Sequence, residues 1–297
     1  MSDAGSPNLR ARAMVAALGV MWGLNWPAAR MALLDYSPWM FRSIALWVGA
    51  AALFGVAAAR GRVLWVPRGR DRLHLVVAGL LNLAGFNLFS SFAQLGTTTT
   101  RVAIIAYTMP LWVTFLAWLV LGERLDRVRA VALGLGAAGI AALIIPFLGG
   151  TIPIGMWFAL GAAVSWAAGT VYVKWAAVSA DPFVIAGWQL AAGGVAAVAG
   201  LLLFGGTPRL LPEHWQAGVG LFYNVVFGTA LAYYVWFEVV ARLPAATAAL
   251  GVLMVPVVGV SSAMLLVGDR PTPMDFVGFA LVMTAAGCVL LRPAPKV

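Results

Sequence analysis

The most constraining feature of the sequence is an internal repeat. Three groups of residues in the first half return in the same order in the second half, roughly 145 residues later. One matched group could arise by chance, but three in order, with a small steady drift, indicate two halves of one architecture. The matched groups are Trp22, Arg30 and Pro38 with Trp166, Lys174 and Pro182; Pro110 and Gly122-Glu123-Arg124 with Pro256 and Gly268-Asp269-Arg270; and Ala132-Leu133 with Ala280-Leu281.

The composition restricts the chain to the membrane. Charged residues make up 10% of it, against about 25% in ordinary soluble domains, and the mean hydropathy is +0.95. A soluble chain this apolar could not cover its surface, so an all-α polytopic membrane protein is predicted. The net charge of +9 is then expected to serve orientation and contact with lipid head groups, not nucleic acid. The single cysteine, Cys288, excludes a thiolate metal cluster, and we expect neither metal nor cofactor.

Ten apolar segments approach the roughly 20 residues that a membrane helix needs. Fourteen Lys and Arg residues would lie on the cytoplasmic side, and five outside, if both termini were cytoplasmic. The positive-inside rule therefore predicts that orientation in a bacterial inner membrane. The segments are about 11–33, 38–59, 73–95, 99–121, 128–147, 153–175, 182–204, 216–241, 245–267 and 273–291.

The repeat pairs segments one to five with segments six to ten, which predicts repeats at 1–150 and 151–297. Because five is odd, the second repeat must be inverted relative to the first. Inverted repeats around a central cavity allow two related states, each open to one face, which is the basis of alternating access. Two fused repeats can close such a pathway within one chain, so we expect a monomer to suffice.

Matched prolines interrupt the fourth and ninth segments. Pro110 and Pro256 each remove one backbone donor and free a carbonyl about a turn earlier. Inside a bilayer such a carbonyl must face protein or water. We interpret the two prolines as hinges beside a central site, with plain packing kinks as the alternative.

Polar and aromatic side chains inside the apolar segments are the candidate substrate-binding residues. Polar groups avoid lipid and therefore face the protein interior, where they either line a cavity or bond neighbouring helices. Rings supply surface for an apolar solute, and amides fix its polar head. The candidates are Trp22, Asn25, Asn82, Asn87, Tyr107, Trp166, Gln189, Asn224 and Tyr234.

No acidic or basic residue lies near the middle of any segment, which favours a solute that is neutral overall or zwitterionic. Glu238 comes closest, four residues before Arg242 at the end of the eighth segment. This spacing puts both side chains on one helix face. An interfacial ion pair is the first interpretation, and a gating or proton-linked role is the second.

Several of these motifs resemble the EamA family of the drug/metabolite transporter superfamily. The resemblance lies in Trp22-Gly23-x-Asn25 with Arg30 and Pro38, in Leu121-Gly122-Glu123-Arg124, and in the degenerate second copy. It implies a ten-helix basket with a cavity lined by helices 1, 3, 4, 6, 8 and 9. It also implies export of amino acids or related metabolites, most like the bacterial exporters of aromatic amino acids. The Pro38-x3-Arg42 spacing departs from the family pattern, which puts the usual role of that arginine in doubt.

The expected function is therefore a secondary transporter that exports amino acids, with aromatic ones favoured. Export of other neutral or cationic metabolites or drugs is the alternative. No Gly-x4-Gly-Lys-Ser/Thr loop is present to bind ATP. An intramembrane enzyme would need a Ser–His pair or paired carboxylates within the spans, whereas His74 and His214 lie in or beside polar loops.

Overall fold

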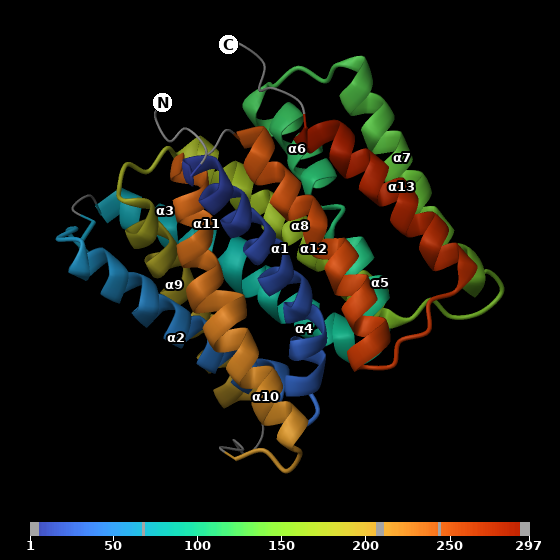
Figure 1. Ribbon diagram of the computed structural model, residues 1–297, viewed down its shortest axis with the longest axis horizontal. Helices are drawn as coiled ribbons and strands as arrows, with labels where there is room; N and C mark the ends of the chain where they lie inside the picture. The colour runs from blue at the N-terminus through green and yellow to red at the C-terminus, as the bar shows by residue number, and fades with distance from the viewer. Residues whose placement is uncertain (1–5, 67–68, 206–210, 243–244, 292–297) are drawn as a thin grey trace.

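The computed structural model describes residues 6–66, 69–205, 211–242 and 245–291, leaving the side chains at 6–12, 241 and 245–250 undescribed. Within these ranges the chain forms helices and no strands (Figure 1). The α-helices are α1 Ser6–Ala32, α2 Pro38–Ala59, α3 Gly69–Gly79, α4 Phe86–Gly96, α5 Thr99–Ala106, α6 Met109–Leu121, α7 Arg127–Ile144, α8 Ile154–Ala176, α9 Pro182–Phe204, α10 Trp215–Tyr223, α11 Ala232–Arg242, α12 Ala245–Leu266 and α13 Pro273–Leu290.

Three shorter elements complete these helices. The π-helical turn η1, Leu80–Gly85, joins α3 to α4, and the π-helical turn η3, Asn224–Leu231, joins α10 to α11. A 3-10 turn, η2, follows α7 at Ile145–Phe147. Among the described residues, eight helical runs are long and apolar enough to cross a bilayer, and Gly251–Leu266 of α12 is a shorter apolar helix. The predicted all-α membrane fold is confirmed.

Packing between the two halves follows a two-fold pattern. Helix α2 packs against its repeat counterpart α9, and α7 packs against its counterpart α13. Helix α1 packs against α12, while its counterpart α8 packs against α5 and α6, which together correspond to α12. The close contacts therefore join one half to the other. The repeat boundary near residue 150 stays a prediction.

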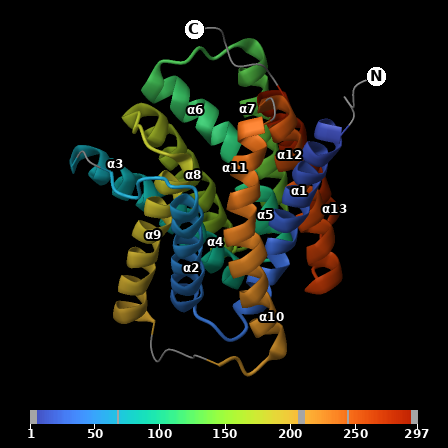
Figure 2. The same ribbon diagram turned by 60° about the vertical axis from the view of Figure 1, so that its left-hand side comes forward.

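The two ends of the bundle differ in which connections they carry. Helix α1 begins and α13 ends at the same end, as Figures 1 and 2 both show. We name this the terminal end and the other the opposite end. The terminal end also carries the turn from α6 to α7 and the turn from α8 to α9. The opposite end carries the α1–α2 turn and the start of α10 (Figure 2).

Two glycines of the sequence repeat end corresponding helices. Gly122 follows α6 with φ of 69°, and Gly268 follows α12 with φ of 72°. Glycine adopts this left-handed conformation without a Cβ clash, so it commonly terminates helices. In both turns the next residue's N–H bonds to the carbonyl six residues earlier, at 3.3 Å. The repeated glycines therefore mark the same helix-ending turn in each half.

The π-helical turns η1 and η3 lie at corresponding places in the two halves, and the sequence did not predict them. A π turn leaves backbone groups without their usual α-helical partners, and such turns are frequent at functional sites. In η1 the carbonyl of Leu81 accepts a hydrogen bond of 2.6 Å from Ser165 Oγ of α8. In η3 the side chain of Asn224 donates to Asn25 Oδ1 of α1 at 2.6 Å. Each π-helical turn is thus bonded to a helix of the other half.

The matched prolines lie in different backbone settings. The fourth span is divided into α5 and α6, and Pro110 lies in the first turn of α6. Helix α12 continues through Pro256 without interruption. The hinge role of the two prolines stays a prediction, and the break at Pro110 makes the fourth span the more segmented of the two.

Two ion pairs connect loops at opposite ends of the molecule in matching ways. Asp35, between α1 and α2, accepts a 2.7 Å bond from the backbone N–H of His214 and pairs with its Nδ1 at 2.8 Å. At the terminal end, Asp181 between α8 and α9 pairs with Arg62 after α2, at 3.2 Å. The first pair joins the α1–α2 loop to the loop after α9. The second joins the α8–α9 loop to the loop after α2, which is the matching arrangement in the other repeat.

The Asp35–His214 pair predicts a pH-dependent contribution to stability. The backbone hydrogen bond from His214 lowers the pKa of Asp35 below 3.8, and the side-chain bond to Asp35 raises the pKa of His214 above 6.5. The contribution of Asp35 to stability is complete above pH 3.8 and is lost as the pH falls through its lowered pKa. The contribution of His214 to stability is complete below pH 6.5 and is lost as the pH rises through its raised pKa.

We therefore expect Asp35→Asn to lower the thermal midpoint of the detergent-solubilised protein at about pH 5.5, and by less at about pH 9. Thermal unfolding of both proteins at the two pH values measures the difference. The Asp71→Asn variant, at a partly exposed residue in the first turn of α3, should show no such change between pH values. An Asp35→Asn effect that is equal at both pH values would mean that the His214 charge contributes nothing.

Candidate substrate site

A line of aromatic rings crosses the interior between the two halves. Trp22 of α1 meets Tyr233 of α11 edge-on, with ring centroids 6.3 Å apart. One turn further along α1, Trp26 contacts Phe86 of α4 at 6.4 Å, and Phe86 contacts Trp166 of α8 at 5.0 Å. Helix α1 therefore brings together two ring groups, the pair Trp22–Tyr233 and the group Trp26–Phe86–Trp166, and we call them together the ring series.

The predicted amides fall into two groups. Asn25 and Asn224 bond each other across α1 and η3, and Asn224 is fully buried. Asn82 lies in η1 against Gly169 of α8, and its buried Oδ1 has no hydrogen-bond partner among the described residues. Asn87 donates to the Leu83 carbonyl of its own helix at 2.8 Å. Asn25 thus lies at the π-helical turn η3, and Asn82 lies in the π-helical turn η1.

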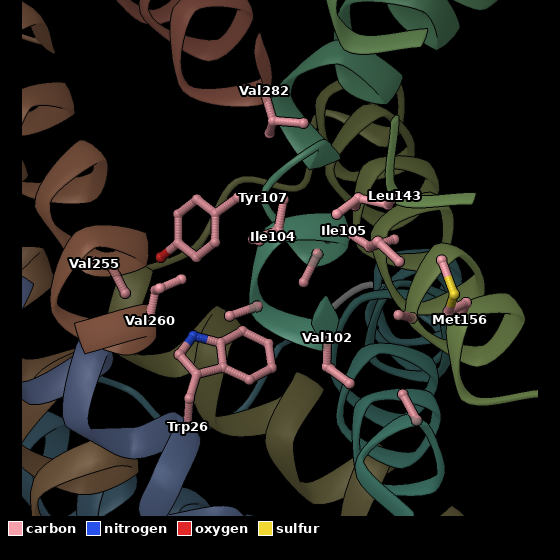
Figure 3. Close-up of a cluster of buried hydrophobic side chains, with 14 residues drawn as sticks. Trp26, Val102, Ile104, Ile105, Tyr107, Leu143, Met156, Val255, Val260 and Val282 are labelled. Atoms are coloured by element: carbon pink, nitrogen blue, oxygen red, sulfur yellow. The ribbon is translucent and has the colours of Figure 1, made fainter. Parts of the chain in front are cut away.

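The remaining candidates lie elsewhere in the bundle. Tyr107 is buried with Trp26, Val255 and Val260 where α1, α5 and α12 meet, as Figure 3 shows. Gln189 is buried on α9, with its backbone against Gly79 of α3. Tyr234 packs on Phe183 of α9 at 6.3 Å, on the α9 side of α11. Tyr107 thus lies beside Trp26 of the ring series, and Tyr234 is connected to Tyr233 through the rings of Phe183 and Phe237.

Arg42 is a buried cation, although the positive-inside count above includes it among the five outer basic residues. It lies one turn into α2 and is 4% exposed. Its Nε donates to Ser91 Oγ of α4 at 2.7 Å, and its guanidinium lies 4.2 Å from the Phe41 ring centroid. Within the described residues no carboxylate lies within ion-pair distance of it. The interior is therefore not uncharged.

Arg42 could have been found from one signal in the sequence. It is the only charged residue in the 38–59 segment, and the 73–95 segment carries the polar stripe Asn87, Ser91 and Gln94. A lone arginine in an apolar helix needs a polar neighbour. Which helix supplies that neighbour depends on tertiary packing, which the sequence does not specify.

Glu238 forms the ion pair with Arg242 that its spacing predicted, and it has a second partner that was not predicted. Its Oε1 accepts from Arg60 Nη2 at 2.6 Å, and its other oxygen from Arg242. The Arg60 guanidinium also lies 4.6 Å from the Phe183 ring centroid. A carboxylate shared by two arginines joins the terminal ends of α2 and α11.

The described residues include no group of three or more His, Cys, Asp and Glu side chains placed to hold a metal ion. A hollow of about 340 Å³ lies at the terminal ends of α3 and α8, and another of about 210 Å³ lies between η1, α6 and α8. Neither is lined by Arg42 or by the ring series.

A two-repeat bundle of membrane helices, with rings and amides where the halves meet, defines the class of secondary transporters. The chain belongs to the EamA-like transporter family, whose model matches residues 10–145 and again residues 153–291.

Several known proteins are similar over nearly the whole chain. An uncharacterized transporter of Bacillus subtilis, YvbV, is 30% identical over 94% of this chain and 91% of its own length. A probable amino-acid metabolite efflux pump of Escherichia coli is 26% identical over 89% of both chains. A solved crystal structure superposes with a TM-score of 0.64 at 22% identity, covering 93% of this chain and 96% of the other, which supports the fold.

Proposed function

We propose that the chain exports amino acids, with aromatic ones favoured, or related small metabolites across the cytoplasmic membrane by alternating access. The observation that carries this proposal is the ring series together with the buried guanidinium of Arg42, which has no ion-pair partner among the described residues. Rings provide apolar contact surface for a side chain, and a guanidinium attracts the carboxylate that every free amino acid carries. The Escherichia coli relative named as a probable amino-acid metabolite efflux pump supports the same class of solute.

A buried guanidinium also argues against the alternative solutes. A cationic metabolite or drug would meet Arg42 with like charge, at low dielectric, where repulsion is strong. A neutral solute without a carboxylate would leave Arg42 buried and uncompensated. An intramembrane enzyme is disfavoured because His74 contacts Tyr172 and Trp175 at the terminal end, while His214 pairs with Asp35. We therefore treat the chain as a transporter and not an enzyme.

The orientation we propose places the terminal end in the cytoplasm. Basic side chains cluster there, as the positive-inside rule requires. The described basic residues of the terminal end include Arg60, Arg62, Arg70, Arg72, Arg124, Arg127, Arg129, Lys174 and Arg242.

The opposite end is closed between the two repeats. There α5 packs against both α1 and α12, around the buried residues of Figure 3. The first half of the fourth span, α5, thus contributes to a seal between the repeats.

Flux through purified protein in liposomes tests the proposal. We expect efflux of labelled phenylalanine and tryptophan above that of protein-free liposomes, and competition by unlabelled aromatic amino acids. Runs with and without a pH gradient separate proton coupling from downhill flow. Transport of an organic cation without transport of any amino acid would favour the drug-exporter alternative.

Replacing Trp166 by leucine is expected to lower phenylalanine flux about tenfold, since losing one ring contact and its apolar area removes roughly 1–2 kcal/mol. The matched control is Trp157→Leu on the same helix, because Trp157 is 52% exposed. Initial rates in liposomes, normalised to the amount of inserted protein, provide the comparison. Equal losses in both variants would remove Trp166 from the site.

A further inference from the structure

Arg42 is held in place from two sides but has no anionic partner among the described residues. Ser91 Oγ donates its own hydrogen to the Asn87 carbonyl at 2.8 Å, so its oxygen is fixed as the acceptor for Arg42 Nε. The Phe41 ring covers one face of the guanidinium. A guanidinium has five N–H donors, and Ser91 uses one of them.

The protein treats its other buried arginine differently. Arg101, whose side chain is 12% exposed, binds Asp275 through two hydrogen bonds of 2.7 and 3.0 Å. Burying a charge without a counter-charge is costly, and structural sites avoid it in this way. No described carboxylate plays that role for Arg42. The missing counter-charge is best explained by a ligand that brings its own.

A second buried polar side chain, on the helix that carries Ser91, also lacks a partner among the described residues. Gln94 lies one turn after Ser91 on α4 and is fully buried, and neither atom of its side-chain amide has a hydrogen-bond partner among the described residues. Its backbone carbonyl is bound by Arg30, which holds this turn of α4 against the end of α1. A buried amide without partners is rare in folded proteins and often marks a site that a ligand completes.

The ring series reaches the elements around Arg42 through α11. Helix α2 packs against η3, the turn that leads into α11. Tyr233, near the start of α11, contacts the Trp22 ring. The position that corresponds to Arg42 in the second repeat is Ala186. The site is therefore asymmetric, with its charge on the α2 side only.

We propose that Arg42, held in position by Ser91, and Gln94 bind the carboxylate of the transported solute while the solute's side chain lies against Trp22 and Tyr233. This assignment rests on the proposed function and adds which group of the solute is recognised and by which residues. A planar guanidinium fits a carboxylate through two parallel hydrogen bonds. Solutes with a carboxylate and a ring are then preferred over amines of the same size.

Two ring compounds that differ in one group test the assignment on purified protein in detergent. The first, 3-phenylpropionate, has a carboxylate and no amine, and the second, 2-phenylethylamine, has an amine and no carboxylate. We expect isothermal titration calorimetry to detect the first and phenylalanine, with the amine bound about tenfold more weakly or not at all. Arg42→Gln should weaken binding of both carboxylates about tenfold or more. The affinity of Arg42→Lys for the carboxylates should lie between those of the wild type and Arg42→Gln, because lysine keeps the charge and loses the paired donors.

Controls separate recognition from folding. Arg62→Gln removes a more exposed guanidinium at the terminal end and should leave both affinities unchanged. If Arg42→Gln does not yield folded protein, Gln94→Met provides the decisive measurement. It should weaken carboxylate binding severalfold without lowering the thermal midpoint, whereas a purely structural glutamine would lower the midpoint and leave affinity intact.

The assignment is overturned if the wild type binds the amine as tightly as the carboxylate, if it binds neither, or if Arg42→Gln and Gln94→Met leave carboxylate affinity unchanged. Failure of the proposed function looks different. In that case the wild type binds 3-phenylpropionate in an Arg42-dependent way but moves no amino acid across liposomes. Phenylalanine flux with the same KM in the wild type and Arg42→Gln would sink the assignment and leave the transporter proposal standing.

Discussion

An Asp275→Ala variant is expected to unfold far more easily than the wild type, with a loss of about 3–5 kcal/mol in the free energy of unfolding. The Asp275 side chain is 2% exposed and receives both hydrogen bonds of the Arg101 guanidinium. Removing it leaves Arg101 buried without a counter-charge, which is the main cost. Asp275 also accepts from the backbone and hydroxyl of Thr272, which completes a capping box at the start of α13. The same change therefore weakens a helix end.

Thermal unfolding followed by circular dichroism in one detergent measures this loss. The control is Glu123→Ala, which breaks the pair with Lys174, whose side chain is 67% exposed, and a longer pair with Arg129 at 3.8 Å. Exposed pairs contribute about 1 kcal/mol or less. Adding Arg101→Met to the Asp275→Ala background should restore part of the stability, because the unpaired charge is then gone. Similar midpoints for Asp275→Ala and Glu123→Ala would show that the pair is not stabilising.

Features of the fold that depend on local sequence could be predicted before the structure was known. Apolar run length located the helices, and glycines at 122 and 268 ended two of them by the same left-handed turn. The membrane class followed from composition alone. These properties depend on residues near each other in the chain, so a single sequence carries them.

Features that depend on the alignment of distant helices could not be predicted in the same way. The burial of Arg42 requires α4 to lie beside α2, and the Arg60–Glu238 pair joins residues 178 positions apart. The π-helical turns have no residue signature, because they differ from an α-helix only in hydrogen-bond register. Of the candidate site residues, Trp22 and Trp166 belong to the ring series and Tyr234 is connected to it through Phe183 and Phe237, whereas Gln189 is buried on α9.

Helix α8 approaches α4 most closely at a glycine, and we expect Gly155→Ala to destabilise the protein by about 1–3 kcal/mol or more. A Cβ at residue 155 would lie 2.4 Å from the Ala93 carbonyl oxygen and 2.5 Å from the Gly96 carbonyl carbon. Both neighbours are backbone atoms, so no side-chain rotation can relieve the clash. The two helices must instead separate where α4 ends.

The matched control is Gly161→Ala on the same helix, where an added Cβ would meet the Phe89 ring at 3.5 Å, an ordinary contact. Alanine favours a helix by roughly 1 kcal/mol over glycine, so this variant should be neutral or more stable. Thermal unfolding of both variants gives the comparison, and a Gly155→Ala midpoint equal to that of Gly161→Ala would contradict it. Because the displaced end of α4 carries Gln94, Gly155→Ala should also weaken 3-phenylpropionate binding. Stability and carboxylate affinity would then fall together in this variant, whereas Gln94→Met lowers the affinity alone.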